Sequence, residues 1–217
     1  MKILIIDNHS IVLSGFLLIF KNEIPDLTFE QITNVKEEFN ISALYNYDML
    51  IMESNIINID SNKLILDIKN ERPTLPILIF SDISDTLFGK RYLQLGAKGY
   101  LNKASNEFEI VKAVKSILAG GIYMSEKLIE KMTDDLMFNR NQLNPFEKLS
   151  KKEQVISKYL IKGFGTLEIA EELSLAQSSV STYKFRIKEK LGVKSTYEIN
   201  QLAAQYNFSN SLFKELK

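Results

Sequence analysis

The 217-residue sequence predicts an α/β domain built on a parallel sheet, followed by a smaller all-α domain. Two patterns lead to this fold class. Through residues 1–120, short apolar segments alternate with amphipathic ones, as in parallel strands connected by helices. Through residues 149–204, helix-capping signals and a glycine-containing break divide the chain into four helices. We therefore expect domains at residues 1–120 and 148–217, connected by a linker helix and tether at residues 121–147.

Five segments of the first domain have the composition of buried strands, because they are short, apolar and rich in β-branched or aromatic residues. These predicted strands are Ile3–Ile6, Leu27–Thr33, Met49–Met52, Ile77–Phe80 and Gly99–Leu101. The amphipathic stretches that alternate with them are assigned to helices at Ile11–Phe20, Lys63–Asn70, Thr86–Leu95 and Glu107–Leu118. Strands of this kind, alternating with helices, form a parallel sheet that is covered on both faces.

The carboxyl ends of these strands carry a set of polar residues. The set comprises Asp7, Asn8, Glu53, Ser81, Asp82 and Lys103. In open parallel sheets, ligands bind outside the carboxyl ends of the strands. The set resembles that of the receiver domain of response regulators, and the resemblance extends through the whole first domain. It implies a flavodoxin-like fold with five parallel strands, a receiver pocket formed by these six residues, and Tyr100 at the aromatic switch position.

The pocket departs from the receiver pattern at three positions. Family members phosphorylate an aspartate at the position of Glu53, whose side chain is one methylene longer. Asn8 replaces one of the two carboxylates that hold Mg²⁺, and Asp82 stands where the family usually has a small residue. Phosphoryl transfer needs a short carboxylate in line with the donor and a metal ion held by several oxygens. We therefore predict that this receiver is not phosphorylated, doubt that it has a cognate histidine kinase, and expect Mg²⁺ binding at Asp7 and Glu53 to be weak.

The remaining groups of the pocket allow two interpretations. Ser81 can donate to the Glu53 carboxylate and Lys103 can pair with it, so that the pocket imitates part of the phosphorylated state. Alternatively, Glu53 and Lys103 form an ion pair that stabilises an inert scaffold. The residues are compatible with both.

The linker between the domains combines a helix with a polar tether. Residues 125–140 have amphipathic helical spacing, and Ser125 is the expected N-cap. The polar stretch that follows ends at the helix-breaking Pro145.

The second domain carries the signals of four helices. Capping boxes at Ser150–Glu153 and Ser195–Glu198 begin the first and the last. The two helices between them are predicted at about Leu167–Leu173 and Gln177–Leu191, with Gly192 ending the longer one. Two helices joined by a tight turn, with polar and basic residues exposed on the second, form a helix-turn-helix.

This segment resembles the C-terminal domain of LuxR/NarL-type regulators. Three stretches carry the resemblance: Glu168–Leu173, Ser179–Val180 and Lys190–Val193. The match covers nearly the whole of residues 149–204. It implies double-stranded DNA as a partner, with the third helix of the domain facing the major groove.

The predicted third helix has an apolar side and a polar side. At about 100° per residue, Val180, Tyr183, Ile187 and Leu191 fall on the side that packs on the other helices. The candidate DNA-contacting residues are Ser178, Ser181, Thr182, Lys184, Phe185, Arg186 and Lys188. The resemblance implies that Ser181, Thr182 and Phe185 face bases, whereas the three basic residues suit phosphates.

A homodimer is the expected assembly, because helix-turn-helix proteins usually dimerise to reach two half-sites. The fourth helix offers an apolar face formed by Ile199, Leu202, Ala203 and Tyr206. The face of the first domain around Tyr100 is a second candidate for the contact.

The charge of the chain is unevenly divided. The whole sequence has 27 Lys and Arg against 27 Asp and Glu. Residues 144–217 hold 12 of these basic and 8 of these acidic residues, which leaves 15 and 19 for residues 1–143. An acidic first part and a basic second part indicate that only the second part meets nucleic acid.

The composition argues against several classes of protein. Without cysteine there is no disulfide, thiol catalysis or cysteine-ligated metal. No apolar run approaches the roughly 20 residues of a membrane span, and the first residues turn acidic too soon for a signal peptide. We therefore expect a cytoplasmic protein without membrane contact. With no catalytic set in view, we do not expect an enzyme.

The sequence thus predicts a DNA-binding transcriptional regulator that acts independently of phosphorylation. Two other functions stay open. The protein could be a conventional response regulator controlled by phosphorylation, or its receiver could serve as an adaptor that binds a protein or a small ligand.

Overall fold

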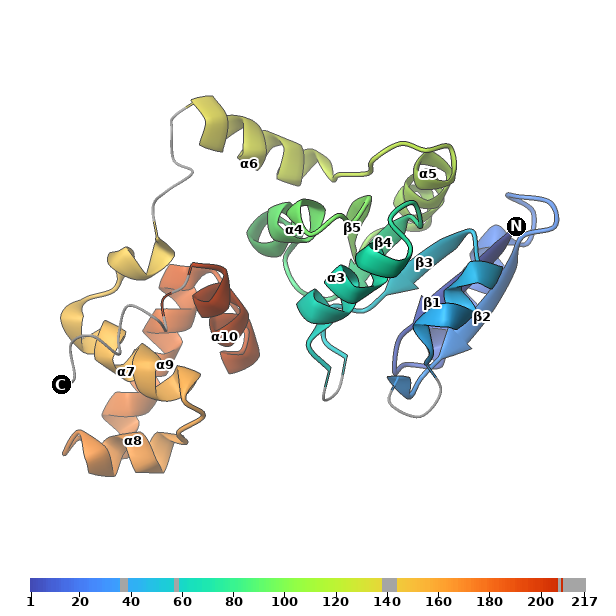
Figure 1. The fold of residues 1–217 in the computed structure, drawn as a ribbon. Coiled ribbons are helices and arrows are strands. Elements are labelled where there is room, and N and C mark those ends of the chain that lie inside the picture. Colours follow the sequence, from blue (N-terminus) through green and yellow to red (C-terminus); the bar gives the residue numbers. More distant parts are fainter. Residues whose placement is uncertain (36–38, 57–58, 138–143, 207, 209–217) are drawn as a thin grey trace. The chain divides into compact units, whose positions relative to one another are not determined.

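The computed structural model describes residues 1–35, 39–56, 59–137, 144–206 and 208. The chain forms two compact units, an α/β unit at Met1–Thr133 and a helical unit at Asp134–Lys217 (Figure 1). None of the helices in this described part combines the length and the apolar composition that crossing a membrane requires.

The first unit is a five-stranded parallel sheet with helices on both faces, as the sequence predicts. The order of the strands is β2-β1-β3-β4-β5. The strands are β1 Lys2–Ile6, β2 Thr28–Ile32, β3 Met49–Met52, β4 Ile77–Ser81 and β5 Gly99–Asn102. The helices are α1 Ile11–Phe20, α3 Ser61–Glu71, α4 Asp85–Gln94 and α5 Glu107–Leu118. Each of these elements lies within one or two residues of its predicted position.

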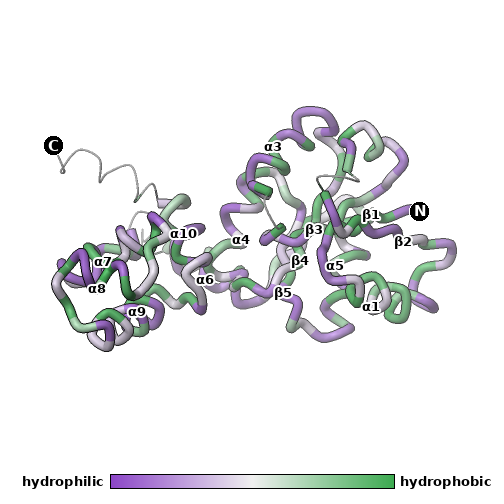
Figure 2. The backbone as a smooth tube through the Cα atoms, turned by 90° about the horizontal axis from the view of Figure 1, so that it is seen from below, coloured by the Kyte–Doolittle hydropathy of each residue, from purple (hydrophilic) through white to green (hydrophobic). Residues whose placement is uncertain are grey.

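The burial of β2, β3 and β4 matches their places in the sheet. Every residue of β3 and β4 is buried, because helices cover both faces of the sheet at its centre. β2 contains no fully buried residue and forms an edge. On one face, α1 and α5 pack Phe16, Phe20 and Ile117 against the strands, and Figure 2 shows α3 on the opposite face from α1. The carboxyl ends of the strands are thereby held at one edge of a rigid layer.

A 3₁₀ helix, η1, lies at Ile41–Asn46 between β2 and β3, where the sequence predicts no regular element. The Asn40 side chain begins it by accepting a hydrogen bond from Ser42 N at 3.0 Å. Leu44 is completely buried. Six residues with one buried leucine are too few to show a helical period, so amphipathicity could not indicate this element.

The linker helix α6 spans Glu126–Met137. Ser125 caps it as predicted, since Ser125 Oγ accepts a hydrogen bond from Leu128 N at 3.1 Å. Leu128 is buried against α4, where a Cβ on Gly89 would lie 2.6 Å from Leu128 Cδ2. The missing side chain at Gly89 therefore makes room for α6. The predicted end of the linker helix and most of the tether lie outside the described residues.

The second unit contains the four predicted helices. They are α7 Lys151–Ile161, α8 Thr166–Glu172, α9 Gln177–Leu191 and α10 Thr196–Gln205. Gly192 ends α9 with a φ of 69°, in the left-handed region that favours glycine. A short 3₁₀ helix, η3 at Pro145–Lys148, was not predicted. Its Phe146 ring is fully buried and stacks on Phe208 with 3.9 Å between the ring centroids.

Glu153 connects two of these helices. Its carboxylate accepts a hydrogen bond from Ser150 N at 2.7 Å, which completes the predicted capping box at the start of α7. The same oxygen lies 2.7 Å from Lys190 Nζ on α9. Burial raises the pKa of Glu153, but the bonds to Lys190 and Ser150 outweigh it and the pKa is lowered. The carboxylate is thus ionised where α7 meets α9.

Candidate functional site

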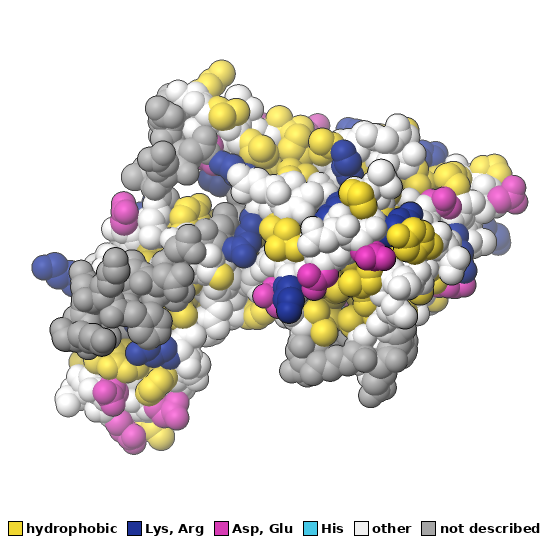
Figure 3. All heavy atoms as spheres, in the orientation of Figure 1, with side chains coloured by type: hydrophobic (Ala, Val, Ile, Leu, Met, Phe, Trp, Pro, Cys, Tyr) yellow, Lys and Arg dark blue, Asp and Glu magenta, His cyan; other side chains and the backbone are white. Residues whose placement is uncertain are grey.

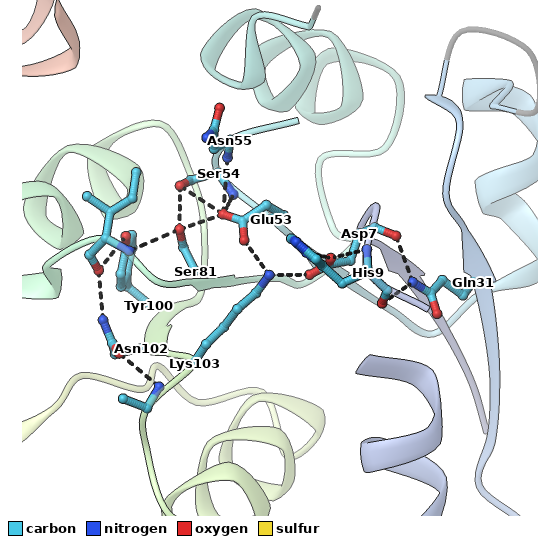
Figure 4. Close-up of polar contacts among 12 residues, drawn as sticks. Asp7, His9, Gln31, Glu53, Ser54, Asn55, Ser81, Tyr100, Asn102 and Lys103 are labelled. Atoms are coloured by element: carbon cyan, nitrogen blue, oxygen red, sulfur yellow. Dashed lines mark hydrogen bonds and ion pairs between the residues drawn. The ribbon is translucent and has the colours of Figure 1, made fainter. Parts of the chain in front are cut away.

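The carboxyl ends of β1, β3, β4 and β5 bring four of the predicted pocket residues together (Figure 4). Asp7 follows β1, Glu53 follows β3, Ser81 ends β4 and Lys103 follows β5. The side chains of Asp7 and Glu53 are only 2% and 3% exposed, and Ser81 is fully buried. Parallel strands end at one edge of the sheet, so residues far apart in sequence meet there.

The Glu53 carboxylate has partners on both oxygens. Oε1 accepts hydrogen bonds from Ser81 Oγ at 2.5 Å and from the backbone N–H groups of Ser54 and Asn55 at 2.6 and 3.1 Å. Oε2 lies 2.5 Å from Lys103 Nζ. The Ser54 and Ser81 hydroxyls are themselves 2.6 Å apart. The charge of Glu53 is therefore distributed over hydroxyl, backbone and ammonium donors.

Asp7 also contacts the Lys103 ammonium. Asp7 Oδ2 lies 2.6 Å from Lys103 Nζ, as an ion pair rather than a directed hydrogen bond. Asp7 Oδ1 accepts a hydrogen bond from His9 N at 2.8 Å and lies 2.9 Å from His9 Nδ1. Burial lowers the pKa of Lys103, but the contacts with Asp7 and Glu53 outweigh it and raise the pKa. Lys103 is therefore a firmly protonated cation between two carboxylates.

Tyr100 lies inside the unit, beside this network. Its side chain is completely buried, and its hydroxyl donates to the Ile83 carbonyl at 3.2 Å. The same carbonyl accepts a hydrogen bond from Asn102 Nδ2 at 2.9 Å. Burial raises the pKa of Tyr100 well above its ordinary value. The tyrosine and Asn102 thus fix the loop that follows Ser81.

Two of the predicted pocket residues do not join the network. Asp82 is exposed and makes no hydrogen bond or ion pair with the described residues. Asn8 is half-buried, and its Oδ1 has no hydrogen-bond partner in the described part of the chain. Asp82 therefore does not contact Glu53, and a repulsive effect on a phosphoryl donor would have to act through space.

Three side chains of the network were not assigned to the site from the sequence. The His9 imidazole contacts Asp7, the Ser54 hydroxyl contacts Glu53 and Ser81, and Gln31 Nε2 donates to the Asp7 carbonyl at 2.6 Å. His9 follows Asp7 by two residues, a spacing at which an aspartate often accepts from a backbone N–H, as Asp7 does from His9 N, so a contact between these two residues had a signal. Gln31 comes from another strand and had none.

The predicted polar side of α9 is open to solvent. Ser178, Ser181, Thr182, Phe185 and Arg186 are exposed, whereas Lys184 and Lys188 are half-buried. Val180, Ile187 and Leu191 are buried, as predicted. Lys184 Nζ donates to Thr166 Oγ1 at 2.9 Å and is thereby held against the start of α8.

The predicted apolar face of α10 is buried inside its own unit. Ile199, Leu202 and Ala203 are each 1% exposed, and Tyr206 is half-buried. α10 packs on α7 and α9, so the apolar stripe completes the core of a small domain. This corrects the expectation that these residues form an exposed dimer contact. Burial of Tyr100 likewise removes its side chain from any outer face.

Known proteins place the chain in a family. Residues 3–115 match the response regulator receiver domain, and residues 147–203 match the bacterial regulatory proteins of the luxR family. The oxygen regulatory protein NreC of Staphylococcus aureus strain JH9 is 30% identical over 209 residues, which cover 94% of this chain and 96% of NreC. The chain is a response regulator of the LuxR family. The regulator is accordingly a DNA-binding transcription regulator that carries a receiver domain.

Solved structures share the fold of the regulator. The RcsB–DNA complex has a TM-score of 0.58 at 21% identity and covers 94% of the regulator and 98% of that chain. RcsB from Salmonella enterica serovar Typhimurium, bound to promoter P1flhDC in the presence of phosphomimetic BeF3⁻, has a TM-score of 0.56 at 23% identity, with coverages of 93% and 97%. This likeness confirms the predicted fold, a receiver domain followed by a helical regulatory domain.

The receiver resemblance implies a Mg²⁺ ion, which the pocket residues of the regulator do not fit. Mg²⁺ requires near-octahedral oxygen ligands, whereas Asp7 Oδ2 and Glu53 Oε2 both face the Lys103 ammonium. In the described part of the chain there is no cluster of three or more acidic or histidine side chains that could hold a metal ion. Asn8 Oδ1 is buried without a partner there, but a neutral amide oxygen does not replace the missing carboxylate.

Proposed function

We propose that the regulator controls transcription without being phosphorylated and without catalytic activity of its own. The observation that carries the proposal is the Glu53 carboxylate, whose two oxygens lie 2.5 Å from Ser81 Oγ and from Lys103 Nζ. These are the hydroxyl and ammonium groups that the receiver resemblance assigns to a phosphoryl group. Glu53 thus supplies permanently a part of what phosphorylation supplies transiently in the family.

Burial of Glu53 supports the same conclusion. A phosphoryl donor must reach a carboxylate oxygen in line, but the Glu53 side chain is 3% exposed and both of its oxygens are engaged. Attack through Oε1 would displace Ser81 Oγ and two backbone N–H groups, and attack through Oε2 would displace Lys103 Nζ. A conventional, phosphorylation-controlled mechanism would therefore begin from an unfavourable rearrangement.

The first test is incubation with acetyl phosphate and MgCl₂, followed by intact-mass measurement and DNA titration. We expect the wild-type mass and DNA affinity to be unchanged. The matched variant Glu53→Asp restores the shorter carboxylate and shows whether the rest of the pocket could support phosphorylation. A stable phosphoryl adduct on the wild-type protein would overturn the proposal.

A second test separates an active carboxylate from an inert scaffold. Glu53→Gln keeps the shape of the side chain and removes its charge, so it weakens the contacts with Lys103 and Ser81. We expect DNA affinity to fall by about tenfold, in line with a typical coupling between sites. Glu71→Gln, on the exposed end of α3, is the control. Equal affinities of wild type and Glu53→Gln would show that the pocket is inert.

We propose that α9 makes the DNA contacts. Its exposed hydroxyls and Phe185, which is 63% exposed, suit base edges and thymine methyl groups. Exposed Arg186 suits a phosphate. In Figure 3 acidic side chains gather over α8, where Glu168, Glu171 and Glu172 are exposed. That surface would repel phosphates, so we expect DNA to lie along α9 and away from the acidic face of α8.

Phe185→Ala tests the base contact. With a site selected from random DNA by the wild-type protein, we expect specific affinity to fall about tenfold, since one lost base contact costs roughly 1–3 kcal/mol. Affinity for random DNA should stay within twofold. An equal loss on both DNAs would mean that Phe185 does not contact bases.

We also propose a homodimer, held by the surface of α1 and α5 rather than by α10. Ile11 and Leu18 are 73% and 76% exposed, and their spacing of seven residues places them on one side of α1. Phe108 at the start of α5 is 74% exposed. Leu18→Glu should reduce the molar mass in light scattering from dimer to monomer. Leu66→Glu, at the partly exposed Leu66 on α3, should leave it unchanged, and a dimer that survives Leu18→Glu would contradict this surface.

A further inference from the structure

The Lys103 ammonium lies where the two acidic side chains of the pocket converge. Nζ is 2.6 Å from Asp7 Oδ2 and 2.5 Å from Glu53 Oε2 (Figure 4). The lysine side chain is 18% exposed and both carboxylates are almost completely buried. The ammonium therefore occupies the point at which a divalent cation would have to bridge these carboxylates.

The remaining carboxylate oxygens are also engaged. Asp7 Oδ1 accepts from His9 N, and Glu53 Oε1 accepts from Ser81 Oγ and from two backbone N–H groups. A metal ion would need these oxygens to turn away from hydrogen-bond donors, because a cation and an N–H group compete for the same lone pairs. Displacing Ser81 Oγ or Ser54 N from Glu53 leaves a buried donor without its acceptor, which is costly.

The charge of the site also fits a single ammonium better than a divalent ion. Asn8 is neutral and the exposed Asp82 does not join the network, so the network contains two carboxylates, Asp7 and Glu53, against one ammonium, Lys103. Their net charge of −1 is distributed over several hydrogen-bond donors. A bound divalent ion would turn this charge to +1 with Lys103 in place. Lys103 would then lie beside a like charge in a buried site, which is unfavourable.

We propose that Lys103 is the resident cation of this pocket, in place of a divalent metal ion. It bridges Asp7 and Glu53, so the regulator binds neither Mg²⁺ nor Mn²⁺ there. The inference rests on the proposed function, because it names the group that holds the Glu53 carboxylate in the absence of phosphorylation. It also implies that removing the ammonium creates a metal site, since two buried carboxylates are then left without a cation.

The test is thermal unfolding of the full-length protein in MgCl₂ and in NaCl at matched ionic strength. We expect the two wild-type melting temperatures to agree within about 1 °C, because an ion that does not bind the folded state cannot stabilise it. Lys103→Met should melt at a lower temperature in NaCl and gain roughly 3 °C or more in MgCl₂. Lys127→Met, at an exposed position of α6, should behave as the wild type in both salts.

Mn²⁺ supplies a readout that does not depend on the variant folding. Water-proton relaxation in a titration of the wild-type protein with Mn²⁺ should show no bound ion at millimolar concentration. Specific Mn²⁺ binding to the wild type, or a folded Lys103→Met that gains no stability from MgCl₂, would overturn the inference. Intact mass after acetyl phosphate treatment separates the two proposals. Metal binding without an adduct refutes the resident ammonium alone, whereas an adduct refutes phosphorylation-independence.

Discussion

The receiver pocket and the outer side of α9 differ in the burial and the partners of their polar groups. In the pocket, the carboxylates of Asp7 and Glu53 are buried and find their partners within the same unit. On α9, Ser181 and Arg186 are exposed and remain available for an external partner. The polar groups of the pocket are thus partnered within their own unit, whereas the outer side of α9 is the surface that we propose for DNA. Substitutions in the pocket should therefore affect mainly stability, and substitutions on α9 should affect mainly DNA binding.

The largest effect should come from Glu53→Leu. It leaves the donors at Ser81 and Lys103 without this carboxylate in a buried site, so we expect a loss of about 3 kcal/mol in the free energy of unfolding. Urea denaturation measures it. Glu71→Leu, on the exposed surface of α3, should change stability by less than about 0.5 kcal/mol. Similar stabilities of the two variants would remove the contrast between pocket and surface.

The two units should lose stability at opposite ends of the pH scale. The folded pKa of Glu153 lies below its ordinary value of 4.5, so its contribution is present above pH 4.5 and is lost as the pH falls through the folded pKa. The folded pKa of Lys103 lies above 10.5, so its contribution is present below that value and is lost as the pH rises through the folded pKa.

The midpoints of urea unfolding, measured across pH, test both of these pH dependences. Glu153→Gln should flatten the acid limb of the stability curve and leave the alkaline limb in place. Lys103→Met should flatten the alkaline limb. An acid limb that Glu153→Gln does not alter would assign acid sensitivity to other carboxyl groups.

Arg186→Ala should leave stability unchanged, because this side chain is exposed. DNA affinity should fall by roughly fivefold for specific and random sequences alike. The slope of log affinity against log salt should decrease by about 1, as expected for one lost phosphate contact. Fluorescence anisotropy at several salt concentrations measures both. A loss confined to the specific site would identify Arg186 as a base contact instead.

The smallest effect should come from Lys184→Ala. Lys184 Nζ already donates to Thr166 Oγ1, so part of its capacity is used inside the unit. We expect its loss to reduce DNA affinity by less than about twofold, well below the effect of Arg186→Ala, because a surface ion pair with a phosphate contributes little when the ammonium already has a partner. The same titrations compare the two variants, and a larger effect for Lys184→Ala would show that DNA displaces the contact with Thr166.

The sequence predicted the sheet and most of the helices because their signals are local. Met49–Met52 and Gln177–Leu191 lie where their apolar patterns placed them. The pocket positions Asp7, Glu53, Ser81 and Lys103 were also predictable, since the resemblance aligned them at strand ends. Gln31 was not, because its contact with the Asp7 carbonyl depends on the pairing of β1 with β2.

The face of α10 shows a different limit. Ile199, Leu202 and Ala203 form an apolar stripe, and a stripe does not reveal whether it packs on its own domain or on a second copy. In a domain of four short helices, core residues are few, and α7 needs this stripe to complete its own packing. The segment at η3 was missed for a related reason, because Phe146 is one buried ring in a polar, proline-containing stretch.

The space left by Gly89 determines which side of α6 faces α4. Leu128 fits that space, and Ser125 begins α6 three residues earlier. One residue inserted between Ser125 and Leu128 would turn Leu128 by about 100° around the helix axis, away from α4. We therefore expect relatives to have no insertion or deletion between the positions of residues 125 and 128. The position at which α6 starts therefore depends on its packing against the receiver.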